Sequence, residues 1–166
     1  MTTKRLIQVV AIPLLLLTGG MQKQTMVLSA PIGQPPEERA LQMTLPHSQS
    51  PVWLELVKSK VGYNDKNGLY YIHVTPEVKA MAGQDITING FVMPLDASDH
   101  TKHFLLTRNT PVCMFCPPGE PNEVVEVISP YRIVWTDKIV TVTGPLMLVN
   151  NGEKGIFYKI VADNVR

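Results

Sequence analysis

From residue 85 to the C-terminus, apolar and polar residues alternate in five short segments. Such alternation is typical of strands that bury one of their two faces. The segments are separated by turn-forming clusters, DASDH, CPPGEPN and NNGEKG, that are rich in Gly, Pro, Asn, Asp and Ser. We therefore predict five strands, in DITINGFVMPL (85–95), KHFLLTR (102–108), EVVEVIS (123–129), KIVTVTGPLMLV (138–149) and GIFYKIVAD (155–163).

Two of the longer segments contain an internal glycine, at Gly90 and Gly144. Glycine inside a strand often marks a bulge or a tight bend, and would let a long strand serve both layers of a closed sheet. Five short, strongly bent strands favour a small five-stranded barrel of the OB type. The alternative is an immunoglobulin-like sandwich, which would need about seven strands.

The stretch before the barrel mixes helix and strand signals. Residues 51–63 (PVWLELVKSKVGY) fit a short helix or a first strand, because their apolar period is ambiguous. NDKNG (64–68) marks a turn, and LYYIHV (69–74) is rich in the β-branched and aromatic residues of strands.

The segment TPEVKAMAG carries the signals of a short helix. Thr75 suits the N-cap, Pro76 the first helical position and Gly83 the C-cap, so we predict one or two helical turns. The predicted fold class is mainly β, a small five-stranded OB-like barrel with a short α/β N-terminal lead-in.

Residues 1–30 have the features of a secretory signal peptide. Lys4 and Arg5 give a positive start, an apolar run follows from Leu6 to Leu17, and small or polar residues come next. We expect cleavage after Ala30 and a periplasmic or secreted protein. The alternative is a retained anchor that tethers the protein to the membrane, although the run is shorter than the roughly 20 apolar residues of a spanning helix.

The sequence also predicts how the rest of the chain is divided. Met21 stands where a lipoprotein signal would have its lipidated cysteine, so we expect no lipid anchor. Residues 31–50 are proline-rich and polar, which predicts a flexible linker. Residues 51–166 then form one barrel domain, a length sufficient for a single core.

Charge narrows the classes of partner. Removing residues 1–30 takes away three of the 15 basic residues and none of the 14 acidic ones, which leaves a net charge of −2. A weak, mixed charge does not suit nucleic-acid binding, which calls for a basic face. We find no Ser-His-Asp pattern, phosphate-binding glycine loop or carboxylate pair, so we expect a binding module and not an enzyme.

Both cysteines of the chain lie in one segment, NTPVCMFCPPGEPNE, as Cys113 and Cys116. A structural disulfide is one interpretation, because exported proteins with two cysteines usually pair them. Closing so small a loop removes little chain entropy, but it would stiffen a long connection between strands.

A metal site is the second interpretation of the pair. Thiolates are soft ligands for copper and zinc, and the spacing lets Cys113 and Cys116 reach one ion. A tetrahedral site needs further ligands, and the nearest candidates are His103 and His100 in DHTKHF. Since residues three apart on a regular strand face opposite ways, both histidines could bind the ion only if His100 lies in the turn.

Thiol–disulfide exchange is the third interpretation. Active C-x-x-C pairs take a low thiol pKa from the N-terminus of a following helix. Here Pro117, Pro118, Gly119 and Pro121 follow, which do not readily form one. The prolines instead stiffen the loop, so the choice lies mainly between a disulfide and a metal clamp.

Three stretches together, INGFVMPLD, KHFLLTRNTPVCMFCPPGEPNEVVEV and VTVTGPLMLV with GIFYKIVAD, resemble a family of exported bacterial proteins catalogued as domain of unknown function 3299. The resemblance runs from about Pro51 to the C-terminus. Proteins similar to these are often encoded near ABC-transporter permease components, some of them in operons governed by metal supply. The resemblance therefore implies a periplasmic accessory role in zinc or copper handling, with a permease or another envelope protein as partner.

Overall fold

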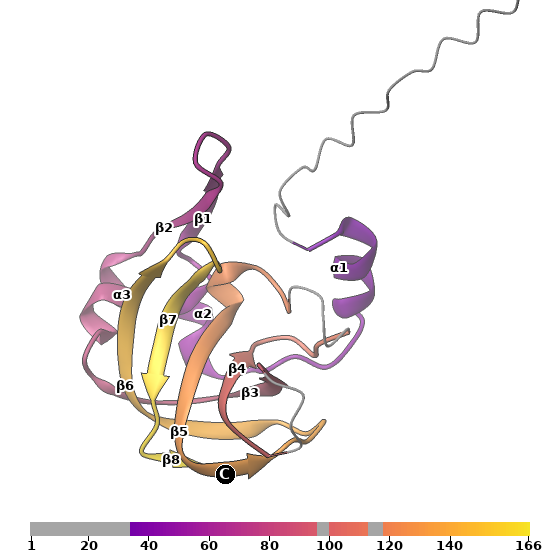
Figure 1. Ribbon diagram of the computed structural model, residues 1–166, viewed down its shortest axis with the longest axis vertical. Helices are drawn as coiled ribbons and strands as arrows, with labels where there is room; N and C mark the ends of the chain where they lie inside the picture. Colours follow the sequence, from indigo (N-terminus) through magenta and orange to yellow (C-terminus); the bar gives the residue numbers. More distant parts are fainter. Residues whose placement is uncertain (1–33, 96–99, 113–117) are drawn as a thin grey trace, which may run out of the picture.

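The structure, a computed structural model, describes residues 34–95, 100–112 and 118–166 (Figure 1). Its elements in chain order are α1 (Pro36–Gln42), α2 (Pro51–Leu56), β1 (Lys60–Asn64), β2 (Leu69–His73), α3 (Pro76–Met81), β3 (Asp85–Pro94), β4 (His100–Thr107), the 3-10 turn η1 (Pro121–Glu123), β5 (Val124–Val134), β6 (Val140–Asn151), β7 (Ile156–Val161) and β8 (Asn164–Val165).

Five of these strands close into a barrel. The strand order is β3-β4-β5-β7-β6, and β6 pairs again with β3. All the neighbours are antiparallel except β5 and β7, which run parallel. A five-stranded closed barrel of this mixed kind confirms the predicted fold class, a small OB-like barrel with a short α/β lead-in.

Glycines lie at or near the points where two of the long strands change partner, as the sequence predicted: Gly90 at the change in β3, and Gly144 two residues before the change in β6, where pairing with β3 ends at Pro145 and pairing with β7 begins at Leu146. In β3, residues 85–90 pair with β6 and residues 91–94 pair with β4, so the change occurs at Gly90. A Cβ atom at Gly90 would lie 2.5 Å from the carbonyl oxygen of Thr107, and one at Gly144 of β6 would lie 2.7 Å from that of Val161. Only glycine allows the backbones to approach this closely.

The barrel interior is one apolar core that extends into the lead-in. Inward-facing side chains of the barrel strands are almost fully buried, among them Ile88, Phe104, Leu106, Val125, Val127, Val142, Leu146, Tyr158 and Ile160. Trp53 and Leu56 of α2 and Val78 of α3 belong to the same cluster. The indole nitrogen of Trp53 donates a hydrogen bond to the carbonyl oxygen of Asn89 at 2.7 Å, so α2 is fixed to β3.

The ambiguous stretch before the barrel divides into two elements. Residues 51–56 form α2, with Pro51 at the first helical turn, and β1 begins at Lys60. β1 and β2 form a separate two-stranded sheet, which projects past one end of the barrel (Figure 1). In α3, Thr75 Oγ1 accepts a hydrogen bond from the backbone nitrogen of Val78 at 3.3 Å, which confirms the predicted cap.

The segment expected to be a linker, residues 31–50, contains structure in its described part. Helix α1 occupies residues 36–42 and lies to one side of the barrel (Figure 1). After it, the backbone nitrogen of Ser48 donates to the carbonyl oxygen of Arg108 at 2.8 Å, and His47 forms a β-bridge with Asn109. The difference arises because the polar side chains of α1 find buried partners far along the chain, which local composition does not reveal.

Candidate functional site

The sequence places the candidate chemistry in the connection between β4 and β5. Cys113 and Cys116 lie outside the described residues, whereas the two ends of the connection, up to residue 112 and from residue 118, are described. The site is therefore characterised by the side chains that hold these two ends.

One side-chain amide binds both ends of the cysteine loop. Gln42 Nε2, at the end of α1, donates to the carbonyl oxygens of Thr110 and Pro118, each at 3.0 Å. Its Oε1 accepts a hydrogen bond from Arg39 at 3.2 Å, so both ends of the amide are engaged. Gln42 is 1% exposed, and a buried polar group with this set of partners fixes the distance that the loop must span.

A partly buried ion pair holds the same helix in place. Arg39 Nη1 and Nη2 donate to the two carboxylate oxygens of Glu123 at 2.6 and 2.8 Å. The backbone nitrogen of Glu120 donates to the same carboxylate at 3.2 Å, and Arg108 Nη1 lies 3.7 Å from it. Two-point pairing of a guanidinium with a carboxylate is both strong and specific in its geometry. We call Arg39, Gln42 and Glu123 the loop clasp.

The pKa values of the ion pair follow from these contacts. Burial raises the pKa of Glu123, but the hydrogen bonds and charge of Arg39 and the backbone nitrogen of Glu120 outweigh it, so the net pKa lies below its usual value. The hydrogen bond to Glu123 raises the pKa of Arg39. Both groups therefore stay charged at neutral pH, and the clasp remains closed.

The helix presents its two clasp residues because of their spacing. Arg39 and Gln42 are three apart in PEERALQ, so they lie on the same face of α1. Pro36 starts the helix at a position where its missing N–H is not needed. The sequence analysis did not identify either residue, because their partners lie 68 to 84 residues away.

The predicted histidines lie on β4, His100 as its first residue and His103 as its fourth. His103 Nε2 is 2.7 Å from Glu126 Oε1 on β5, and Lys159 Nζ on β7 is 3.4 Å from Glu126 Oε2. Burial raises the pKa of Glu126, but the contacts with His103 and Lys159 outweigh it and lower the net value. His100 is the first residue of β4, and its carbonyl oxygen accepts a hydrogen bond from Arg132.

These positions bear on the predicted metal ligands. Within residues 34–95, 100–112 and 118–166, no group of three or more His, Cys, Asp or Glu side chains is arranged to hold a metal ion. His100 and His103 therefore do not form such a group with the described carboxylates. Cys113 and Cys116, the other two predicted ligands, lie outside the described residues.

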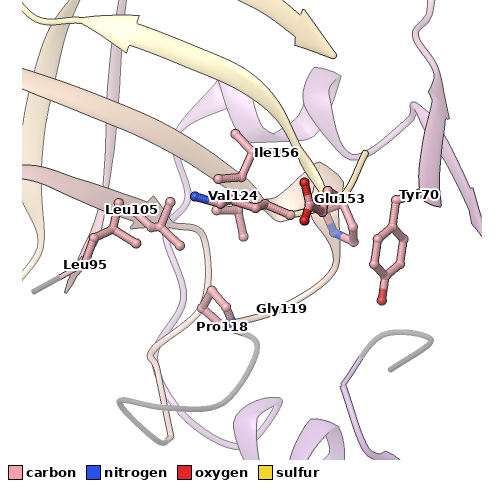
Figure 2. A pocket seen from close by; sticks show the side chains of 11 residues that line it. Tyr70, Leu95, Leu105, Pro118, Gly119, Val124, Glu153 and Ile156 are labelled. Atoms are coloured by element: carbon pink, nitrogen blue, oxygen red, sulfur yellow. The ribbon is translucent and has the colours of Figure 1, made fainter. Parts of the chain in front are cut away.

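An apolar pocket of about 310 Å³ adjoins the cysteine loop (Figure 2). Its floor comes from outward-facing residues of three barrel strands, Leu105, Val124 and Ile156, which are at most 8% exposed. Figure 2 shows Leu95 and Leu105 at one end of the pocket and Tyr70 at the other, with Pro118 between the two ends. The sequence analysis missed this pocket, although three apolar residues on the outer face of a barrel are the signal that marks it.

Together these features define a small OB-type barrel that presents a clasped loop and an apolar pocket at one end. The chain belongs to the DUF3299 family, described as proteins of unknown function, whose model matches residues 34–165. It is similar to a DUF3299 family protein from Pseudomonas aeruginosa PAO1 with a crystal structure at 2.45 Å resolution. The two are 21% identical, with 83% of this chain and 87% of that chain covered and a TM-score of 0.46. No curated protein matches the chain.

Across the described ranges of the chain, none of the helices combines the length and the apolar character needed to cross a bilayer.

Proposed function

We propose that the protein is an exported accessory protein that binds zinc or copper through Cys113 and Cys116. The observation that supports this proposal is the loop clasp, in which Gln42 binds Thr110 and Pro118 at the two ends of the loop. A loop whose ends are already fixed loses less entropy when two thiolates converge on one ion. Thiolates in a C-x-x-C pair suit Cu(I) and Zn(II).

His103 is the third ligand of this proposal. His103 uses Nε2 to contact Glu126, an arrangement in which a carboxylate orients a metal-binding imidazole through its other ring nitrogen. Nδ1 would then be the atom that His103 offers to the metal. The metal, when bound, supplies a cross-link between the two sulfurs, and the clasp residues keep the loop ends in place.

The compartment and partner belong to the same proposal. Residues 1–30 carry the features of an export signal, and the family resemblance implies an ABC-transporter permease or another envelope protein as the partner. In this role the protein carries or presents the metal and catalyses no reaction.

Titration of the reduced, metal-free protein with Zn(II) and with Cu(I) tests the proposal. We expect saturation at one ion per chain, and loss of binding in the Cys113→Ser/Cys116→Ser variant. His73→Ala, which removes an exposed histidine at the end of β2, serves as the matched control and should bind as the parent does. Equal metal binding by the double serine variant and the parent would show that the cysteines are not the ligands.

The apolar pocket favours a second candidate, a non-catalytic interaction module in which the two cysteines form a structural disulfide. Its apolar floor is suited to an apolar side chain of a protein partner. Mass spectrometry with and without reductant distinguishes the two candidates. A purified protein lighter than its reduced form by two hydrogen atoms, with no metal bound in either state, would favour the interaction module.

A further inference from the structure

A second pocket, of about 260 Å³, lies between the β1–β2 hairpin and the end of β6. It is lined by residues that share one property, the absence of a charge, namely Asn64, Asn67, Leu69, Tyr70, Tyr71, Asn150 and Gly152. Three carboxamides and the phenol ring of Tyr71 give this hollow a composition unlike that of the apolar pocket beside Pro118. The lining combines hydrogen-bonding groups with a flat aromatic surface. Because no lining residue is charged, the pocket does not attract ions strongly.

Two of the carboxamides are oriented by the hairpin turn. Asn64 Oδ1 accepts from the backbone nitrogen of Lys66 at 3.0 Å, and Asn67 Oδ1 accepts from that of Leu69 at 3.2 Å. Because the oxygens are used by the turn, the Nδ2 groups are the ends with which these side chains can donate to a ligand.

The third carboxamide comes from an irregularity in the barrel. Between the pairs Leu148–Tyr158 and Asn151–Ile156, β6 advances by three residues and β7 by two, so β6 carries one extra residue. Asn150 lies in this bulge and is exposed. A bulge redirects a side chain away from the regular alternation of the strand, and here it adds Asn150 to the lining of the pocket.

Tyr71 provides a flat aromatic surface. It lies opposite Gly62 on β1, and a Cβ atom at Gly62 would be only 2.3 Å from Cζ of the ring. The ring therefore lies over the glycine backbone, where no side chain intervenes, and the residue is still 45% exposed. A ring supported on one face and accessible on the other can stack on the apolar face of a ligand.

The hairpin is joined directly to the barrel, so the pocket is formed before any ligand binds. The backbone nitrogen of Tyr70 donates to the carbonyl oxygen of Gly152 at 2.9 Å, and a Cβ atom at Gly152 would lie 2.4 Å from the carbonyl oxygen of Tyr70. A preformed pocket does not have to lose hairpin entropy on binding.

We propose that this pocket binds a neutral oligosaccharide. Sugars present hydroxyl groups at their edges, which the carboxamides can bond, and apolar C–H faces, which stack on tyrosine. A ligand with a net charge would find no countercharge among the lining residues. None of the lining residues is a proposed metal ligand, so the proposal does not depend on metal binding.

Titration of the full-length protein with neutral tetrasaccharides, followed by nuclear magnetic resonance of the backbone amides, tests the proposal. The panel comprises β-1,4-linked N-acetylglucosamine, β-1,4-linked glucose and α-1,4-linked glucose. We expect saturable shifts centred on Tyr71, Asn150 and Gly152 with at least one of them, and an affinity that is the same at low and high salt.

Variants connect the binding to the named side chains. Tyr71→Ala and Asn150→Ala should each weaken the affinity by about tenfold, whereas Tyr71→Phe keeps the stacking surface and should stay close to the parent. Trp135→Ala is the matched control, because Trp135 is an aromatic residue with the same 45% exposure but outside this pocket.

Three results would overturn the proposal. The first is no saturable binding of any of the three oligosaccharides by the folded protein. The second is equal weakening by Trp135→Ala and Tyr71→Ala. The third is binding of an uncharged glycine- and serine-rich peptide at the same amides without binding of any oligosaccharide, which would assign the pocket to extended polypeptide.

Discussion

A single buried carboxylate, Glu123, connects the N-terminal helix to the cysteine loop. Its side chain is 6% exposed, and Arg39 and Arg108 are the two cations nearest to it. An ion pair with one buried partner, as here, adds little net stability while intact, because desolvation of that partner offsets the attraction. Removing one partner is costly, since the other charge is left without compensation. The loop clasp is therefore sensitive to substitution at this one position.

We expect Glu123→Gln to lower the free energy of unfolding by about 1–3 kcal/mol, because the amide keeps the size of the side chain but removes the charge that faces Arg39. Urea titration followed by circular dichroism measures the change. Glu55→Gln is the control, since Glu55 forms an ion pair with Lys58 at the surface, and it should change stability by less than about 0.5 kcal/mol. Similar losses in the two variants would show that the buried pair has no special role.

The same comparison has a defined pH dependence. The net pKa of Glu123 is lowered in the folded state, so its contribution is complete above the pKa of the unfolded chain, about 4.3. It is lost as the pH falls from there through the folded-state pKa. The difference in stability between the parent and Glu123→Gln should therefore shrink on acidification. A difference that is constant from neutral pH to well below the unfolded pKa would contradict this account.

The sequence predicts secondary structure that is determined locally and misses contacts between distant residues. The five barrel strands begin within two residues of their predicted starts, because each segment has its own alternation and turn cluster, whereas β5 runs five residues beyond its predicted end, to Val134. Helix α1 was assigned to a linker because PEERALQ has few apolar residues and its partner Glu123 is 84 residues away. Neither pocket was predicted, since each gathers residues from separate strands and loops.

The candidate site shows the same division. The sequence shows Cys113 and Cys116 as a motif, but it does not show the loop clasp that holds the ends of their loop. The contact between His103 and Glu126 requires the register of β4 on β5, in which His103 lies opposite Ile128 and Glu126 lies opposite Leu105, so that the two side chains are diagonal neighbours. Such a register is set by the whole barrel and not by either strand alone.

The closure of the barrel supplies a prediction for Gly90. Gly90→Ala should lower the free energy of unfolding by about 1–3 kcal/mol, because the methyl group would approach the carbonyl oxygen of Thr107 to 2.5 Å and push β3 away from β4. Thermal unfolding measured by circular dichroism reports the loss as a lower midpoint. Gly83→Ala is informative beside it, since its methyl group meets nothing within 4 Å and the cost is only that of a positive φ. A Gly90→Ala protein as stable as the parent would argue against close packing at the strand change.

The lead-in helices α2 and α3 share one apolar core with the barrel. Trp53, Leu56 and Val78 are fully buried among the inward-facing residues of the barrel strands, and Tyr158 donates a hydrogen bond to the carbonyl oxygen of Leu56 at 3.2 Å. Helices α2 and α3 therefore cover an end of the barrel interior that would otherwise be exposed to water. A core of this kind gives no boundary at which the lead-in could unfold alone.

The two tryptophans allow a test of whether the lead-in and the barrel unfold together, because Trp53 is fully buried whereas Trp135 is 45% exposed. In Trp135→Phe, the remaining fluorescence comes from Trp53 and should be blue-shifted until α2 leaves the barrel. Since α2 and the strands share one core, we expect the fluorescence and the far-ultraviolet circular dichroism of this variant to change at the same urea concentration. The surface substitution itself should alter stability by no more than about 0.5 kcal/mol, so the parent should show the same midpoint. A red shift of the Trp53 emission at clearly lower urea than the loss of strand signal would show that α2 detaches first, and the lead-in would then be a separate cooperative unit.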